Sequence, residues 1–182
     1  MKIAVVGAQN VGKTTFVQDF AEEFSNYKSY TSSLKNIAEE KGLHLNQMTS
    51  KETQFLIMNH LYKLISEDKN ENVIFDRCLI DNFVYTATSY KAGKVSAEFL
   101  EVSKEKMFGH LRFLDAIFFI PVSISISIEE NKYRDTDKKY IDLVNQIFIE
   151  ILLEISKISK IKIYVLNGDR KERIEQVKKY LF

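Results

Sequence analysis

Nine residues near the start of the chain, GAQNVGKTT at 7–15, have the types and spacing of a phosphate-binding loop. The first eight match G-x-x-x-x-G-K-[ST] at every fixed position. Gly7 and Gly12 allow backbone angles and close approaches that a side chain would block. Backbone N–H groups of the loop, and the positive end of the helix that follows, can then surround a di- or triphosphate. We predict that the nucleotide is held by Gly7, Ala8, Gln9, Asn10, Val11, Gly12, Lys13, Thr14 and Thr15.

Two side chains of this loop could take part in chemistry. In such a loop, the lysine, here Lys13, reaches the β- and γ-phosphates, and the hydroxyl of Thr14 binds Mg²⁺. The alternative is an ordinary glycine turn before a helix. At average composition the full pattern arises by chance in roughly one chain in a hundred or fewer. We therefore predict a site for a nucleoside triphosphate with Mg²⁺.

A second group of candidate residues is Asp76 and Arg77, which directly follow the apolar run NVIF at 72–75. In open α/β sheets, ligands gather at the carboxyl ends of the strands. Asp76 would lie beside the loop if its strand neighbours the first one, where a carboxylate can hold Mg²⁺ or accept a proton. Arg77 could bind the phosphate of an acceptor or stabilise the group in transfer. The alternative is an aspartate that caps the next helix, followed by a surface arginine.

The elements that must position these residues alternate between apolar runs and amphipathic stretches. Strands are predicted at 2–6, 27–31, 72–75, 116–120 and 161–166, and helices at 13–25, 34–41, 51–68, 79–91, 96–112, 138–158 and 171–181. Strands separated by helices indicate a parallel sheet covered on both faces. The predicted fold class is α/β, a three-layer sandwich with a five-stranded parallel sheet. No linker is visible, and we predict one domain over residues 1–182.

The composition narrows the class of protein. The 182 residues are 45% hydrophobic and 28% charged with a net charge of +1, so bulk charge does not favour nucleic acid or an anionic membrane as a partner. Cys78 is the only cysteine, which fits a reducing compartment. No apolar run approaches the ~20 residues that span a bilayer. We expect a soluble, cytoplasmic protein without a membrane partner, and the sequence leaves the oligomeric state open, a homodimer included.

With GAQNVGKTT and FDRCLIDNFVY (75–85), the chain resembles the P-loop nucleoside and nucleotide kinases. Thymidylate kinases, deoxynucleoside kinases and the ATP-binding domain of nicotinamide-riboside kinases, phage-encoded relatives included, share such an acid-Arg step at the end of a strand. The resemblance implies the P-loop NTPase fold, ATP and Mg²⁺ as cofactors, and a mobile lid, placed here at about 129–139. It departs at one point: segment 28–33 lacks the carboxylate that deoxynucleoside kinases carry there, which moves the role of base toward Asp76.

Two more positions take their roles from the resemblance. Arg134 lies in the lid-like run YRDTD at 133–137, where an arginine of these kinases closes over the phosphoryl group; a solvated loop is the alternative. Gln54 lies at the edge of the apolar face that we predict for helix 51–68, and it resembles the glutamine with which deoxynucleoside kinases read the base. A solvent-exposed amide in the first turn is the alternative. We assign that apolar face to Phe55, Met58, Leu61, Tyr62 and Ile65.

Three classes of function compete. An ATP- and Mg²⁺-dependent phosphotransferase acting on a small nucleoside or nucleoside monophosphate accounts for the loop, Asp76, Arg77 and the lid. A GTP-binding switch is disfavoured, because DRCL at 76–79 lacks the glycine of D-x-x-G and NKYR at 131–134 lacks the aspartate of N-K-x-D. A kinase acting on DNA, or a nucleic-acid-associated P-loop ATPase, is the alternative that remains, since a local groove of lysines would suffice for it.

Overall fold

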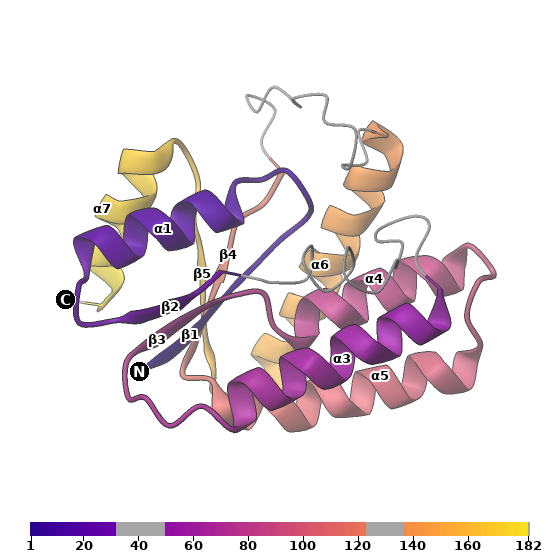
Figure 1. The fold of residues 1–182 in the computed structure, drawn as a ribbon. Helices are drawn as coiled ribbons and strands as arrows, with labels where there is room; N and C mark the ends of the chain where they lie inside the picture. Colours follow the sequence, from indigo (N-terminus) through magenta and orange to yellow (C-terminus); the bar gives the residue numbers. More distant parts are fainter. Residues whose placement is uncertain (32–49, 123–136, 182) are drawn as a thin grey trace.

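Five parallel strands form one sheet in the computed structural model, which describes residues 1–31, 50–122 and 137–181 (Figure 1). The order across the sheet is β2-β3-β1-β4-β5. The described strands are β1 (Lys2–Val6), β2 (Lys28–Tyr30), β3 (Val73–Asp76), β4 (Ala116–Phe119) and β5 (Lys162–Val165). The five-stranded parallel sheet predicted from the sequence is confirmed.

Helices cover both faces of this sheet. They are α1 (Lys13–Glu23), α3 (Lys51–Ser66), α4 (Leu79–Lys91), α5 (Ala97–His110), α6 (Lys138–Ile158) and α7 (Arg170–Leu181), with a 3₁₀ turn η2 (Leu111–Phe113). Helices α1 and α7 pack together on one face, and α4 packs against α3, α5 and α6 on the other (Figure 1). The fold is therefore the three-layer α/β sandwich that was predicted.

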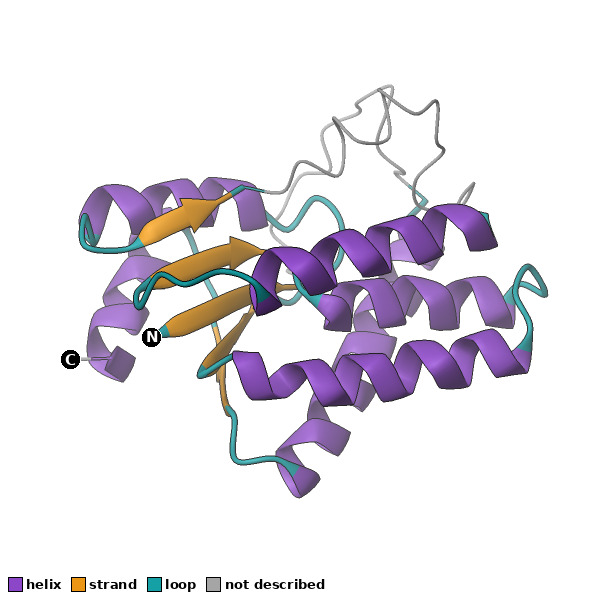
Figure 2. Cartoon of the chain, turned by 60° about the horizontal axis from the view of Figure 1, so that its bottom comes forward, coloured by secondary structure: helices purple, strands orange, loops and turns teal. Residues whose placement is uncertain are grey.

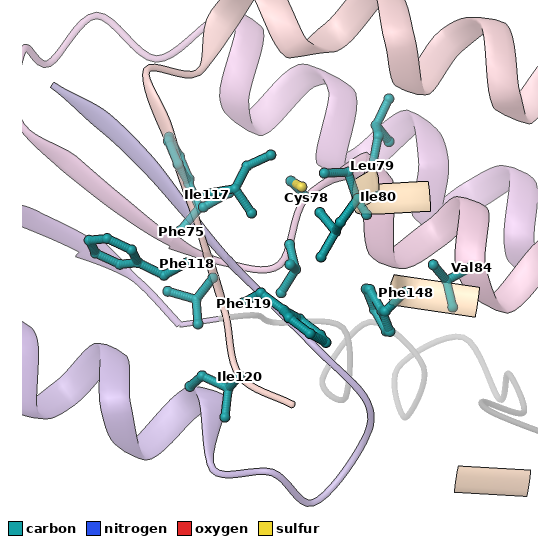
Figure 3. Packing of buried hydrophobic residues seen from close by; sticks show 14 of the residues in the cluster. Phe75, Cys78, Leu79, Ile80, Val84, Ile117, Phe118, Phe119, Ile120 and Phe148 are labelled. Atoms are coloured by element: carbon teal, nitrogen blue, oxygen red, sulfur yellow. The ribbon is translucent and has the colours of Figure 1, made fainter. Parts of the chain in front are cut away.

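The three central strands are buried because they are apolar along their whole length. Every residue of β3 and β4 is buried, as are Ile3 to Val6 of β1, which is the pattern of strands covered on both faces. Figure 3 shows side chains from β4 meeting those of α4 and α6, with Phe119 and Phe148 at a ring-centroid distance of 5.9 Å. This core fixes the carboxyl ends of β1 and β3 next to each other.

The bounds of β1, α4 and α6 match the predicted ones, and the other predicted elements among the described residues differ by one or two residues at an end. The clearest error concerns α3, where Phe55 was assigned to the buried face but is 46% exposed. The buried stripe instead runs through Gln54, Ile57, Met58, Leu61 and Ile65. Helix α3 packs mainly on α4, and this neighbouring helix sets which of its faces is buried. The predicted helix 34–41 lies outside the described residues, as does most of the lid at about 129–139.

No helix in the described parts of the chain has the length and apolar character needed to cross a membrane.

Candidate nucleotide-binding site

The loop between β1 and α1 has the backbone shape that its glycines permit. Gly7 and Gly12 have φ angles of 151° and 87°, where a side chain is strained. A Cβ on Gly7 would also collide with the backbone carbonyl oxygen of Ile120, at the end of β4. The loop thus passes close over the sheet and turns directly into α1, whose N-terminal N–H groups are left for a ligand.

Lys13 lies under this loop with its ammonium group turned inward. Its Nζ donates hydrogen bonds to the carbonyl oxygens of Gly7, at 2.8 Å, and Ala8, at 2.6 Å. The side chain is only 4% exposed, so these contacts replace much of the lost hydration. The cation is therefore already held at the inner side of the loop, where a β- or γ-phosphate would lie.

Thr14 and Asp76 meet across two neighbouring strands. The hydroxyl of Thr14 donates to Oδ2 of Asp76 at 2.6 Å. This contact exists because β3 pairs with β1 in parallel, with Asp76 beside Val5, so the carboxyl ends of both strands reach the same edge (Figure 2). The sequence predicted that Asp76 lies beside the loop if its strand neighbours the first one, and the structure shows that the two strands are neighbours.

These two oxygen atoms fit a magnesium ion. Mg²⁺ prefers oxygen ligands and is bound in nucleotide sites by one or two protein groups together with phosphates and water. Thr14 and Asp76 supply a hydroxyl and a carboxylate 2.6 Å apart at the mouth of the loop. Within the described residues, His, Cys, Asp and Glu form no cluster of three that would hold a metal by protein groups alone. A magnesium ion at Thr14 and Asp76 would take its other ligands from phosphates and water.

Arg77 follows β3 in a strained conformation, with a φ angle of 91°. Its backbone N–H donates to the carbonyl oxygen of Val5 at 3.0 Å, which fixes the turn on the side of β1. Burial alone would lower the pKa of the guanidinium, but Tyr85, Asp76 and Asp81 outweigh it and raise that pKa. Strain of this kind persists where the surroundings hold it, often at functional sites. The guanidinium lies near Asp81 and Tyr85 of α4, and Arg77 is only partly exposed, whereas the alternative interpretation makes it a surface arginine.

The first turns of α4 supply a carboxylate that the sequence analysis missed. Asp81 is 2% exposed, and its Oδ2 accepts a hydrogen bond from the backbone N–H of Cys78 at 3.2 Å. Burial raises the pKa of Asp81, an effect that Lys13 and Arg77 only partly offset, and the result is about 6. Asp81 thus caps α4 while facing both cations of the site.

Tyr85 lies one turn further along α4, and the sequence analysis gave it no function. It is buried, and its hydroxyl donates to Oε1 of Gln9 at 2.9 Å. Burial raises the pKa of Tyr85 to about 12, although Arg77 acts in the opposite direction. The spacing of 81 and 85 was the available signal, because positions four apart share one face of a helix. Side-chain types alone could not show that this face turns toward the loop.

Gln54 is buried at 2% exposure, so the solvent-exposed alternative is wrong. It lies between α3 and α4, where Nδ2 of Asn82 donates to its Oε1 at 3.0 Å and to its backbone carbonyl at 2.9 Å. Asn82 is 3% exposed and adjoins Asp81. The two amides form a buried polar pair between α3 and α4, which no single-residue signal in the sequence predicted.

The C-terminal helix also contacts the loop. Arg173 of α7 donates from Nη1 to the carbonyl oxygen of Val11 at 3.0 Å and is 7% exposed. Asp169 accepts hydrogen bonds from the backbone N–H groups of Lys171 and Glu172, both at 2.9 Å, and so caps the start of α7. The hydrogen bond from Arg173 therefore ties α7 to the loop. Arg134, predicted to close over the site, lies outside the described residues.

Comparisons with known proteins agree with this geometry. A family model described as an AAA domain matches residues 2–173. No curated protein matches the sequence. Deoxyadenosine kinase from M. mycoides superposes with a TM-score of 0.75 at 20% identity, over 100% of this chain and 98% of that one.

Two further structures share the fold. The NadR protein in complex with NR gives a TM-score of 0.74 at 17% identity, over 98% of this chain and 50% of NadR, so this chain spans half of that protein. Thymidylate kinase from Candida albicans gives 0.68 at 16% identity, over 99% of this chain and 90% of that one. The chain belongs to the AAA-domain family, and its fold is that of P-loop kinases such as deoxyadenosine kinase and thymidylate kinase.

Proposed function

We propose that this chain is an ATP- and Mg²⁺-dependent phosphotransferase that acts on a small nucleoside or nucleoside monophosphate in the cytoplasm. One observation carries the proposal: Lys13, Thr14 and Asp76 meet at the carboxyl ends of β1 and β3, with Arg77 in the next turn. A loop that only binds nucleotide does not need a strained arginine beside it. We further propose that residues 1–182 act as one kinase domain.

In this proposal the loop holds the triphosphate, and its backbone N–H groups from 8 to 15 surround the β- and γ-phosphates. Lys13 exchanges its bonds to the carbonyl oxygens of Gly7 and Ala8 for bonds to phosphate oxygens. The exchange needs little movement, because the ammonium group already lies at the inner wall of the loop. A charge fixed in advance stabilises a transition state without reorganisation.

Thr14 and Asp76 hold Mg²⁺, which neutralises charge on the phosphates when it is bound. The hydrogen bond between the two side chains favours metal binding by Asp76 over a role as base, because it holds the carboxylate beside the hydroxyl of Thr14. Phosphoryl transfer passes through a loose transition state, so the acceptor's proton is lost late and demands little of a base. The earlier assignment of Asp76 as base is therefore replaced by metal binding in the proposal.

Arg77 faces the acceptor, with Gln54 and Asn82 on the helices behind it. Its guanidinium can bind the three equatorial oxygens of the phosphoryl group as their charge spreads. The amide pair at Gln54 offers donors and acceptors of the kind that read a base edge, which supports a nucleoside or nucleotide as acceptor. Arg134 from the segment outside the described residues is proposed to close over the same group and exclude water.

The proposal is tested by incubating the protein with radiolabelled ATP and, in parallel, free nucleosides, nucleoside monophosphates and DNA ends. We expect label on one small acceptor class, and a loss of transfer with Lys13→Ala while the far-UV circular dichroism spectrum is unchanged. Lys104→Ala is a matched control, because this lysine pairs with Glu154 at the surface, far from the loop. Label on DNA ends alone, or hydrolysis that no acceptor stimulates, would contradict the proposal.

A further inference from the structure

The side chain of Gln9 leaves the loop and reaches helix α4. Gln9 is the third residue of the loop, and its Oε1 accepts the hydroxyl proton of Tyr85 at 2.9 Å. The residue is 5% exposed, so its amide is almost entirely removed from water. Its role in the loop so far was that of a backbone N–H donor; the structure gives its side chain a defined position as well.

The contacts of Tyr85 fix which way round this amide lies. A tyrosine hydroxyl has one proton and two lone pairs. Of the two polar atoms of the Gln9 amide, Oε1 is the one within hydrogen-bond distance of this hydroxyl, at 2.9 Å, and an amide oxygen can only accept. The hydroxyl's own proton is then left for Oε1 of Gln9, and the raised pKa of Tyr85, about 12, keeps that proton in place at neutral pH. The NH₂ group of Gln9 must therefore point away from Tyr85.

That NH₂ group has no acceptor among residues 1–31, 50–122 and 137–181. A buried donor without an acceptor destabilises the folded protein, and such groups are rare outside functional sites. The Nε of Arg77 lacks an acceptor in the same described region. Two unmatched donors, from the loop and from the turn after β3, indicate that a group rich in acceptor oxygens belongs between them.

We propose that Gln9 is a catalytic residue whose side-chain amide donates a hydrogen bond to an oxygen of the γ-phosphoryl group, and that Tyr85 positions this amide. The inference rests on the proposed function. Gln9 directly follows Gly7 and Ala8, whose carbonyl oxygens hold the ammonium group of Lys13. Its side chain reaches Tyr85, which also interacts with Arg77, so the amide and the guanidinium share a neighbour beside the loop. In the proposed function this is the side on which the transferring group passes.

The first test compares two nucleotides that differ only in the γ-phosphoryl group. The variant Gln9→Leu keeps an uncharged side chain of similar bulk and removes the donor. Titration with Mg²⁺ and either ADP or a non-hydrolysable ATP analogue should show that the analogue binds roughly 10-fold more weakly, while the Kd for ADP changes less than about twofold. The kcat for transfer should fall by roughly 10- to 100-fold.

Tyr85→Phe tests the positioning role, because it keeps the ring and removes the hydroxyl. It should reduce kcat in the same direction as Gln9→Leu, and adding it to Gln9→Leu should cause little further loss, since there is then no amide to orient. Tyr90→Phe is the matched control: Tyr90 is on the same helix but is 43% exposed, and its loss should leave kcat and both Kd values unchanged.

Equal weakening of ADP and the analogue by Gln9→Leu would overturn the inference, since Gln9 would then only shape the loop. A rise in the acceptor's KM alone would also overturn it, because the bonded oxygen would belong to the acceptor. The binding arm needs no acceptor. If the wild-type chain phosphorylates nothing, but Gln9→Leu selectively weakens the analogue, the kinase proposal fails and the contact to the γ-phosphoryl group stands. If the wild-type chain binds neither nucleotide, both fail.

Discussion

Replacing Asp81 by Asn should stabilise the protein at alkaline pH while leaving its stability near pH 4 almost unchanged. Asp81 is buried beside Lys13 and Arg77, and burial holds its pKa at about 6, above the ordinary 3.8. The folded protein therefore keeps the proton more tightly than the unfolded chain does. The stability that this provides is complete below pH 3.8 and is lost as the pH rises through 6.

The size of the effect follows from the two pKa values. They differ by 6 − 3.8 = 2.2, and since one pKa unit corresponds to about 1.36 kcal/mol, the free energy of unfolding changes by about 3 kcal/mol in total. Because Asn resembles the protonated carboxyl group, the variant removes this dependence on pH. It also keeps an oxygen that can accept the hydrogen bond from Cys78, so the cap of α4 is retained. Between pH 4.5 and 8, the variant should gain about 2 kcal/mol over wild type.

The measurement is urea unfolding at pH 4.5 and 8, followed by circular dichroism. His110→Phe is a control of opposite sign, because burial lowers the pKa of His110 to about 4 from the ordinary 6.5. That depressed pKa gives wild-type stability that is present above pH 6.5 and lost as the pH falls toward 4. Phenylalanine can fill the space beside Tyr62 and Phe113, whose ring centroids lie 5.2 Å and 5.5 Å from that of the imidazole.

The two variants should therefore diverge: relative to wild type, Asp81→Asn gains stability as the pH rises, and His110→Phe gains as the pH falls. If the difference between Asp81→Asn and wild type were the same at pH 4.5 and 8, the carboxylate would not be held at a raised pKa. It would then be wrong that the buried, ionised Asp81 beside Lys13 and Arg77 lowers the stability of the folded protein.

Three further predictions concern the site. Asp76→Asn should weaken activation by Mg²⁺ by roughly 10- to 100-fold in assays that vary the metal, because a neutral amide replaces a carboxylate ligand; an unchanged metal dependence would remove Asp76 from the metal site. Arg173→Met should raise the Kd for nucleotide by roughly 10-fold in a titration, because the loop loses the hydrogen bond to Val11, whereas an unaltered Kd would show that this bond does not shape the loop. Arg134→Ala should lower kcat more than it raises the KM for ATP, and equal losses in both would exclude a role in the transition state.

The loop and Asp76 show how much structure a sequence motif can predict. The side-chain types at 7–14 are fixed by backbone geometry and phosphate chemistry, so the motif predicts local structure on its own. To place Asp76 beside the loop, only one fact about the tertiary structure was missing, namely that β3 pairs with β1. The weak strand at 27–31 is present as Lys28–Tyr30 at the edge of the sheet, where a short strand needs a single partner.

The error at Phe55 has a physical cause. Phe55 was placed in the core because it is apolar and falls near the right face, but α3 packs on another helix and leaves it 46% exposed. The period of the pattern was right and the direction of the face was wrong, since direction is set by the neighbouring element. Tyr85 is buried, and only the packing shows that its hydroxyl meets Gln9 of the loop.

By itself, the sequence determined the phosphate-binding loop, the parallel α/β sandwich and the pairing of an acid with an arginine at the end of a strand. These depend on interactions between residues close in the chain and on burial, which periodicity records. Only the tertiary structure decided that Tyr85 bonds to Gln9 and that Arg77 lies near Tyr85 and Asp81. Their contacts join a loop to a helix more than sixty residues away, and no local pattern encodes which polar atoms will lack a partner once both are packed together.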